Sequence, residues 1–491
     1  MTIAICCVVA GCAVAPEPLT SEAMDAFAAT KRADATAGQE PVTRAIDLYE
    51  AIARSLKYNL DARVEELQRD LKIRDFERAS LNMLPGLVAN TGYAARDEFS
   101  GGTSQSLITG QQSLEASTSQ ERKLRTADLS FSWNILDFGL SFVRARQAAD
   151  EALVADEARR KAINRIVEDV QTAFWRAVSS EKLAADLRAL GWRVQGAIRR
   201  TRALARNNET SPITAITYER ELVEIKREVE HLEGELRVAK TQLAALMNLD
   251  PATRYSLVLR SKGIGPGRLG EPEQMVDIAL RNRPEMAEVA LKLRINRNEA
   301  HAALLELLPG IQLYAGSNFD SNEFLFTNDW VNWGAKASWN LMRLVQYPAR
   351  RASVEAGDEL LNERALAVTM AIMTQVYVSR IRYAHTKKEL ATASEYLDVQ
   401  TRLIEKMRIQ AGEDRISEQT LIREEMNTLV ARVRRDIAFS AHQSAIANMY
   451  STVGRDPCTP EFVSENGVDA IAQLLRSGNG WHDAFFRVAE R

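Results

Sequence analysis

The sequence predicts a mainly α-helical protein with a small β part, built as two tandem copies of one strand-and-helix unit. Three observations predict this fold: short motifs recur at fixed spacings, two segments alternate apolar and polar residues, and one long segment places apolar residues every three and four positions. The chain has 491 residues, enough for two such units. Its 24 Gly and 13 Pro gather in a few places, which favours long uninterrupted helices.

An internal repeat organises the chain. The tryptophans of two Ser-Trp-Asn motifs and the prolines of two Asp-Pro motifs each lie 206 positions apart, whereas two Leu-Pro-Gly motifs lie 224 apart. The extra 18 residues predict a longer loop between Gly86 and Trp133 in the first copy. A repeat of this length indicates two pseudo-symmetric halves, not a solenoid array. The motif pairs are Leu84-Pro85-Gly86 with Leu308-Pro309-Gly310, Ser132-Trp133-Asn134 with Ser338-Trp339-Asn340, and Asp250-Pro251 with Asp456-Pro457.

These motifs divide the chain into six parts. In each repeat we expect a helix ended by Pro-Gly (46–84 and 275–308), two strands, a very long helix, a polar tip and a returning helix. Glycines and prolines between the repeats indicate a linker. The parts are a lipoprotein-like signal peptide (1–11), an N-terminal linker (12–43), the first repeat (44–257), a Gly/Pro linker (258–272), the second repeat (273–457) and a C-terminal extension of unknown role (458–491).

The predicted strands alternate with a period of two over 127–135 and 331–341, which puts their apolar side chains on one face of a sheet. In a soluble sandwich that face would meet a core, but in an outer-membrane barrel it would meet lipid. Two further strands begin at Leu87 and Ile311. Four strands are too few for a closed barrel, so several chains would have to pool theirs. The membrane-facing candidates are Leu129, Phe131, Trp133, Val331, Trp333 and Trp339; Trp330 could join an aromatic girdle, with core tryptophans as the alternative.

Helical segments of unusual length follow the strands. The segment 138–206 would extend about 100 Å as one helix, at about 1.5 Å per residue. After Pro212, apolar residues step by three and four alternately, which is typical of left-handed coiled-coil packing. Such lengths favour a helical tunnel across a periplasm. The seam residues are Leu222, Ile225, Val229, Leu232, Leu236, Ala239, Leu243 and Leu246.

The N-terminus has the features of a secretory signal. Val9-Ala10-Gly11-Cys12 resembles a bacterial lipobox and predicts lipidation of Cys12, although no basic residue precedes it. A chance Gly-Cys in an ordinary signal peptide is the alternative. Cys458 would remain without a partner in the mature chain, so we expect no disulfide framework. One acyl chain anchors only weakly, so stable attachment would need a second membrane element.

Several function classes find no support in the residues. A net charge of −3 gives no basic stripe for a phosphate backbone, so we expect no nucleic-acid partner. The five His are scattered without metal-ligand spacing. Asp137-Phe138-Gly139 lacks the other kinase signatures, and no Ser/His/Asp or Cys/His set has a local signature. We therefore expect no enzyme activity, no cofactor and no metal site.

The order of elements, repeated twice over about 44–457, resembles the TolC-like outer-membrane efflux proteins. Trp133-Asn134-Ile135-Leu136-Asp137-Phe138-Gly139 is similar to the family motif Trp-x-Leu-Phe-Asp-x-Gly at the strand-to-helix junction. The Leu-Pro pairs before the strands and the two Asp-Pro ends also match. The second copy departs from the family pattern, because Tyr347-Pro348 lies where the family has its Asp-x-Gly turn.

This resemblance implies a homotrimer with a twelve-stranded β-barrel in the outer membrane of a Gram-negative bacterium, in contact with its lipid. A periplasmic α-helical barrel would continue from it and dock to a periplasmic adaptor and an inner-membrane transporter. The implied function is a passive, gated conduit for efflux or type I secretion. The alternative is a non-channel periplasmic coiled-coil scaffold or adaptor protein, in which the strands form a small soluble domain.

The two polar tips, aligned at the offset of 206, are the predicted adaptor-docking sites. Gly412 suits the positive φ often needed at a helix end, and the two serines could cap the returning helices. Glu413 and Asp414 could form acidic rings at a periplasmic gate in a threefold assembly. The docking candidates are Ala205, Asn208, Ser211, Ala411, Gly412 and Ser417.

Overall fold

Two copies of one unit make up most of the chain, and their elements match in order and length. The structure, a computed structural model, describes residues 17–206, 211–251, 253–258, 271–413, 415–416, 418–454 and 459–477. The first copy runs through α3 (Leu48–Tyr58), α4 (Leu60–Leu81), β1 (Gly86–Ala95), β4 (Lys123–Asn134), α5 (Ile135–Arg206) and α6 (Pro212–Leu246). The second runs through α7 (Pro272–Asn282), α8 (Pro284–Leu305), β5 (Gly310–Asp320), β6 (Asp329–Ser338), α9 (Met342–Gly412) and α10 (Glu418–Thr452).

Element lengths confirm the predicted duplication. The helices α4 and α8 each have 22 residues, and α6 and α10 each have 35. The helices α5 and α9 have 72 and 71 residues, which corresponds to roughly 110 Å each. Outside the two copies lie α2 (Ser21–Ala35), α11 (Pro460–Glu465) and α12 (Val468–Arg476).

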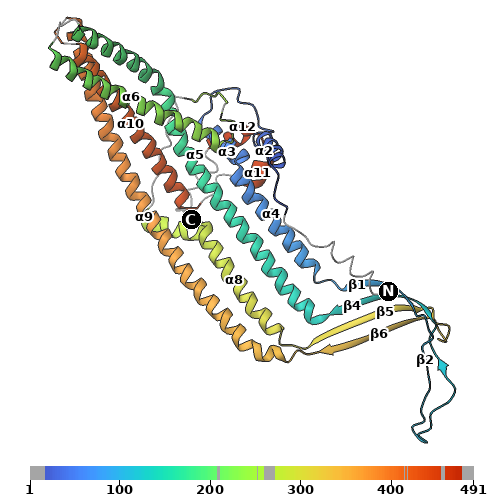
Figure 1. Ribbon diagram of the computed structural model, residues 1–491. Coiled ribbons are helices and arrows are strands. Elements are labelled where there is room, and N and C mark those ends of the chain that lie inside the picture. The colour runs from blue at the N-terminus through green and yellow to red at the C-terminus, as the bar shows by residue number, and fades with distance from the viewer. Residues whose placement is uncertain are drawn as a thin grey trace.

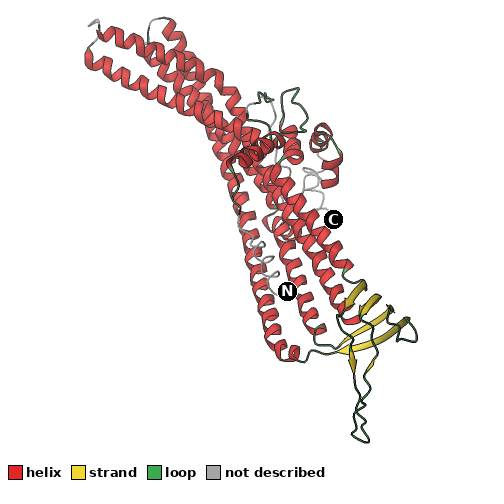
Figure 2. Cartoon of the chain, turned by 45° about the vertical axis from the view of Figure 1, so that its right-hand side comes forward, coloured by secondary structure: helices red, strands yellow, loops and turns green. Residues whose placement is uncertain are grey.

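The four long strands form one antiparallel sheet at one end of the elongated molecule (Figure 2). The strand order is β1-β4-β5-β6, so the pairing of β4 with β5 joins the two copies. As predicted, the first copy has the longer loop: residues 96–122 connect β1 to β4, whereas 321–328 connect β5 to β6. The longer loop carries a small hairpin of β2 (Gly101–Gly102) and β3 (Ser117–Thr118), which projects beyond the sheet (Figure 1).

The helices lie side by side in a curved wall (Figure 1). Next to the sheet, the packing order is α4-α5-α8-α9; toward the opposite end it is α6-α5-α10-α9. The predicted seam on α6 is confirmed at the described positions, because Leu222, Val229 and Leu243 are buried. A second set of buried residues, which includes Leu187 and Ile422, joins α5, α6 and α10 near the tips.

One large apolar cluster, the mid-body core, holds the long helices together near their middle. Its residues come from α3, the start of α4, α5, α6, α7, α9, α10 and α12, and from segments that flank these helices. The ring of Trp175 meets Phe174 and Phe439 edge-on, with centroids 5.3 and 5.1 Å away. Such pairs favour close packing beyond simple burial. The largest members of the core are Ile46, Ile52, Phe174, Trp175, Leu243, Met247, Met275, Ile372 and Ile446.

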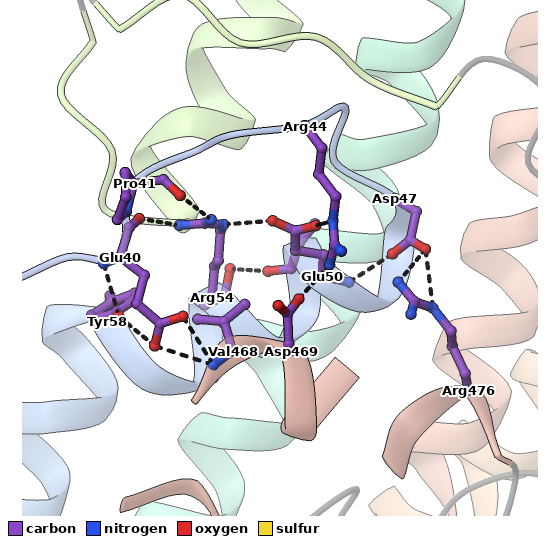
Figure 3. A network of polar contacts seen from close by, with 12 residues as sticks. Glu40, Pro41, Arg44, Asp47, Glu50, Arg54, Tyr58, Val468, Asp469 and Arg476 are labelled. Carbon is purple, nitrogen blue, oxygen red and sulfur yellow. Dashed lines mark hydrogen bonds and ion pairs between the residues drawn. The ribbon is translucent and has the colours of Figure 1, made fainter. Parts of the chain in front are cut away.

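The C-terminal extension is part of this core. One face of α12 buries Val468, Ile471, Ala472 and Leu475 against α3. Next to it, polar contacts join the two ends of the described chain, and we call them the terminal clasp (Figure 3). They are Glu40 with the Val468 amide, which donates at 3.2 Å, Arg44 with Asp469, and Arg476 with Asp47 at 2.6 Å.

A buried ion pair supports the clasp from within α3. Arg54 donates to the Glu50 carboxylate at 3.1 Å and to the Glu40 carbonyl at 2.8 Å, and both charged side chains are buried. Because every polar group of this pair has a partner, its burial is tolerated. A hydrogen bond from Lys57 is the main reason why the pKa of the Glu40 side chain lies below its ordinary value.

The prediction of one continuous helix over 46–84 and another over 275–308 is wrong in one respect, because each segment forms two helices with a break between them. The first breaks at Asn59, whose Oδ1 caps α4 by accepting from Asp61 N at 3.0 Å and Ala62 N at 3.2 Å. Its Nδ2 donates to the Leu246 carbonyl at the end of α6. The second breaks at Arg283, which is extended because the following proline disfavours the helical region for the residue before it.

Both returning helices end in a left-handed residue at equivalent positions. Asn248 has φ of 56° after α6, and Gly454 has φ of 74° after α10. By contrast, the expectation of positive φ at Gly412 is wrong: α9 continues through it, and Glu413 ends the helix with φ of −98°. Ser211 occupies the N-cap of α6 but its side chain makes no capping bond; Pro212, with its fixed φ, begins the helix instead.

Gly454 cannot accept a side chain without strain. A Cβ there would lie 2.8 Å from the Arg283 Cα atom, in addition to the cost of positive φ. We expect Gly454→Ala to lower the free energy of unfolding by about 3 kcal/mol, measured by denaturant unfolding of the purified protein. Gly38→Ala is the control, since Gly38 has φ of 73° with nothing within 4 Å, and should cost only about 1 kcal/mol. Equal losses in both variants would contradict this explanation.

Candidate functional site

The register of the sheet separates an apolar face from a polar face. Directly paired residues lie on the same side of an antiparallel sheet. Phe131 pairs with Leu87 and Ala315, and Trp333 pairs with Ala315 in turn, so one apolar surface crosses all four strands. This apolar face comprises Leu87, Ala89, Ala127, Leu129, Phe131, Trp133, Ile311, Leu313, Ala315, Phe319, Val331, Trp333, Ala335 and Ala337.

The opposite face is polar and is stabilised by hydrogen bonds between strands. Asn90 donates to Asp128 at 3.0 Å, and Asn318 donates to Asn332 at 2.9 Å. Trp330 pairs with Asn318 and therefore lies on this polar face. The suggestion that it joins the girdle of the other tryptophans is wrong, since three positions separate it from Trp333 and strand side chains alternate.

No second layer of the described residues covers the apolar face. Of the six predicted membrane-facing residues, Leu129, Phe131, Val331, Trp333 and Trp339 are exposed, and Trp333 reaches 83%. Trp133 is half-buried, with its ring 5.7 Å from that of Phe138. Trp339 follows β6, and its ring nitrogen donates to the Leu307 carbonyl at 2.9 Å. Together these residues form an exposed apolar surface of the kind that marks an interaction site.

Membrane-spanning helices are a separate question. Within the described ranges, no helix combines the length and hydrophobicity needed to cross a bilayer.

The helical wall also exposes apolar stripes at its two edges. On α4 the residues Leu60, Val64, Leu67 and Leu71 are exposed at alternating steps of four and three. That spacing is a heptad seam, and none of the described helices covers it. The same spacing is visible in the sequence of 60–71. The stripe on α9 includes Leu366, Met370, Tyr377, Ile381, Val399 and Leu403.

Ion pairs tie neighbouring helices of the wall together. Glu299 on α8 binds Arg144 on α5 and Arg350 on α9, the latter at 2.9 Å. Burial alone would raise the pKa of Glu299, but hydrogen bonds from Arg144, Arg350 and Gln147 outweigh it and lower the pKa to about 2. Nearer the tips, Glu425 joins Arg193 to Arg408. Sequence reasoning missed these contacts, because partners so far apart in the chain leave no local pattern.

The helix ends that flank both predicted tips lie at the end of the molecule opposite the sheet (Figures 1 and 2). Ala205 is in the last turn of α5, and Ala411 and Gly412 end α9. Glu413 follows and pairs with Arg415 at 3.0 Å. Asn208, Asp414 and Ser417 lie outside the described residues, as does Cys12. The structure thus brings the two tips to one end without describing either turn in full.

Metal chemistry has no site in the described part of the chain. No group of three His, Cys, Asp or Glu side chains there could hold an ion.

Comparison with known proteins identifies the fold. No family model matches the chain, and no curated protein does. Solved structures do match. The outer-membrane channel OprN is 15% identical, with a TM-score of 0.63 over 86% of this chain and 95% of that one. The open-state Neisseria gonorrhoeae MtrE outer-membrane channel is 15% identical, with a TM-score of 0.64 over 83% of this chain and 88% of that one. The Campylobacter jejuni CmeC outer-membrane channel is 12% identical, with a TM-score of 0.60 over 89% of this chain and 90% of that one.

The chain therefore has the duplicated strand-and-helix fold of the TolC-like outer-membrane channels. This confirms the fold that the repeated motifs predicted. The neighbours named above are channel proteins, not enzymes.

Glu299 predicts a specific acid sensitivity. Its folded pKa of about 2 lies below the ordinary value of 4.5, so its stabilising effect is present above about pH 4.5 and is lost as the pH falls toward 2. We expect Glu299→Gln to remove about 2 kcal/mol at neutral pH, allowing for partial exposure, and little at pH 2, measured by unfolding at each pH. Glu355→Gln, which breaks the exposed pair with Arg351, should have almost no effect. A loss that is equal at both pH values would rule out the carboxylate as the cause.

Proposed function

We propose that this protein is an outer-membrane channel subunit that provides a passive, gated conduit across the outer membrane and periplasm. The uncovered apolar face of the sheet carries this proposal. A sheet that is apolar on one side and polar on the other suits a barrel wall between lipid and a water-filled lumen. Four strands cannot close, so a barrel requires several copies of the chain. Three copies would give the twelve strands of the TolC-like arrangement.

The exposed edges of the helical wall support a ring of copies. In each copy α9 lies at one edge, and α4 and α6 lie at the other. A head-to-tail interface that closes would pack the α9 stripe of one copy against the next copy's α4 and α6. Such an assembly covers apolar residues such as Leu67 and Met370, which a single chain leaves exposed.

We further propose that the tips dock to a periplasmic adaptor, which connects the channel to an inner-membrane transporter in efflux or type I secretion. The proposal rests on the position of both tips at the end farthest from the sheet. The docking candidates remain Ala205, Asn208, Ser211, Ala411, Gly412 and Ser417. The alternative of a non-channel scaffold is less well supported, because it leaves the apolar sheet face without a partner.

The channel proposal is tested by outer-membrane fractionation and planar-bilayer recording of the full-length protein and two neighbouring variants. Val331→Arg puts a charge on the apolar face at a cost of about 2–4 kcal/mol near the bilayer centre, so we expect it to prevent stable insertion. Asn332→Arg changes the next residue on the polar face and should still insert and conduct. A soluble wild-type protein without conductance steps would overturn the proposal, and so would equal insertion by both variants.

An acidic gate at the tips is a second part of the proposal. Glu413 and Asp414 from three copies would form rings that attract cations, although Arg415 partly neutralises Glu413. We expect the double variant Glu413→Gln with Asp414→Asn to reduce cation selectivity in bilayer recordings at low salt, where screening is weakest. Glu355→Gln, far from the tips on α9, is the control. Unchanged selectivity in the double variant would remove these residues from the gate.

Lipidation of Cys12 stays a prediction. It would supply a second, weak membrane anchor beside the sheet. The mass of the mature N-terminal peptide measures it directly, and an unmodified cysteine or a cleavage elsewhere would refute it.

A further inference from the structure

The cationic side chains of the sheet are unevenly placed. The four long strands contain three of them: Lys123 and Arg125 on β4, and Lys336 on β6. Lys336 pairs with Gln312 on the polar face. Lys123 and Arg125 share the apolar face with Leu129, because they lie at even spacings from it along one strand. Both cations therefore extend the row Ala127, Leu129, Phe131, Trp133.

These two cations lie at the loop end of the apolar face. The register places Lys123 opposite Ala95 and Arg125 opposite Tyr93, the last residues of β1 before the long loop. Tyr93 is exposed on the same face. At the other end of the strands the apolar face ends in the aromatic side chains of Trp133 and, beyond β6, Trp339. The two borders of the apolar band thus differ in chemistry.

Both cations are available to an external partner. Lys123 and Arg125 are exposed, and neither forms an ion pair with a carboxylate among the described residues. The strand residue of opposite charge on this face is Asp329 on β6, which pairs with Phe319. The strand β5 therefore lies between Asp329 and the two cations. Their Cα atoms are about 7 Å apart along the strand, so both side chains can reach one anionic surface.

We propose that Lys123 and Arg125, with Tyr93 beside them, bind the phosphate groups of lipid A in the outer leaflet. The proposal rests on the channel function above: if the helices cross the periplasm, the loop end of the sheet meets the outer leaflet. There, cations that border the apolar band reach the headgroup layer. Arginine binds phosphate through paired hydrogen bonds, and lysine supplies a point charge. An aromatic residue at this level suits the interface.

The test is a titration of the purified full-length trimer with lipid A, followed by native mass spectrometry. A cation near an anionic lipid surface contributes about 1 kcal/mol, or about fivefold in affinity, so we expect the double variant K123Q/R125Q to bind lipid A about thirtyfold more weakly. The matched control K336Q removes the third strand cation, on the polar face, and should bind as the wild type does. Dephosphorylated lipid A should bind the wild type as weakly as lipid A binds the double variant.

Other outcomes overturn the inference in distinct ways. Equal affinity in wild type and double variant would remove these residues from lipid binding. Competition by phosphatidylglycerol at equal concentration would show a general preference for anionic headgroups, and displacement by inorganic phosphate alone would show a site for the free ion. Bilayer conductance, recorded on the same preparations, separates the two proposals. A wild type that conducts but does not bind lipid A overturns this inference alone. A wild type that neither inserts nor conducts overturns both proposals.

Discussion

The mid-body core is the interaction on which the rest of the structure depends. The helices α5 and α9 are far longer than any globular core, and the large buried side chains that join both copies gather near their middle. Toward the sheet, α4 buries only Ala62 among its described residues. Ion pairs such as that of Glu299 with Arg350 then hold neighbouring helices in register. The sheet is therefore positioned by its helices and needs no core of its own.

Because the mid-body core stabilises the fold and the helices position the sheet, the apolar surface of the sheet can stay exposed on a single chain. In a soluble domain the burial of an apolar sheet face is a main source of stability. Here the side chains of Trp333 and Val331 contribute little to the fold of one chain. Their exposure is what the proposed channel requires, since there they would meet lipid. The polar face is self-sufficient by contrast, because Asn90 and Asn318 already bond across strands.

The duplicated halves reach the same geometry by different chemistry. The break before α4 depends on the side chain of Asn59, whereas the break before α8 depends on Pro284. Each break packs near the end of a returning helix. That end uses Asn248 in the first copy, where its side chain also donates to the Ala35 carbonyl at 2.6 Å, and Gly454 in the second, where Arg283 leaves no room for a side chain. The two copies thus use different residues to form the same helix break and the same helix end.

The duplication, the strands and the long helices could be predicted from the sequence, because each of them leaves a regular pattern of residues. The seam through Leu222 and Leu243 and the alternation through Phe131 are periodic over ten residues or more. The helix break at Asn59 was not predictable in this way, since a capping asparagine in a charged helix resembles any polar residue. Pro284 indicates the second break, at Arg283. The Leu-Pro-Gly motifs lie 224 positions apart, and the residue 224 positions before Arg283 is Asn59, where the first helix breaks. In the candidate site, the apolar face was predictable, but the partners of Glu299 were not, because nothing local links α8 to α5 and α9.

The terminal clasp has a consequence for how the protein is made. Ile471 and Leu475 of α12 belong to the mid-body core and pack on α3, from which they are separated by almost the whole of both repeats. The contacts of α3 with α12 therefore form only after both repeats that lie between them in the chain have been synthesised. A chain that ended before Val468 would keep the residues of all four long strands but would lack the α12 residues of the core. Without α12, the apolar side chains of α3 that it covers would be exposed to solvent.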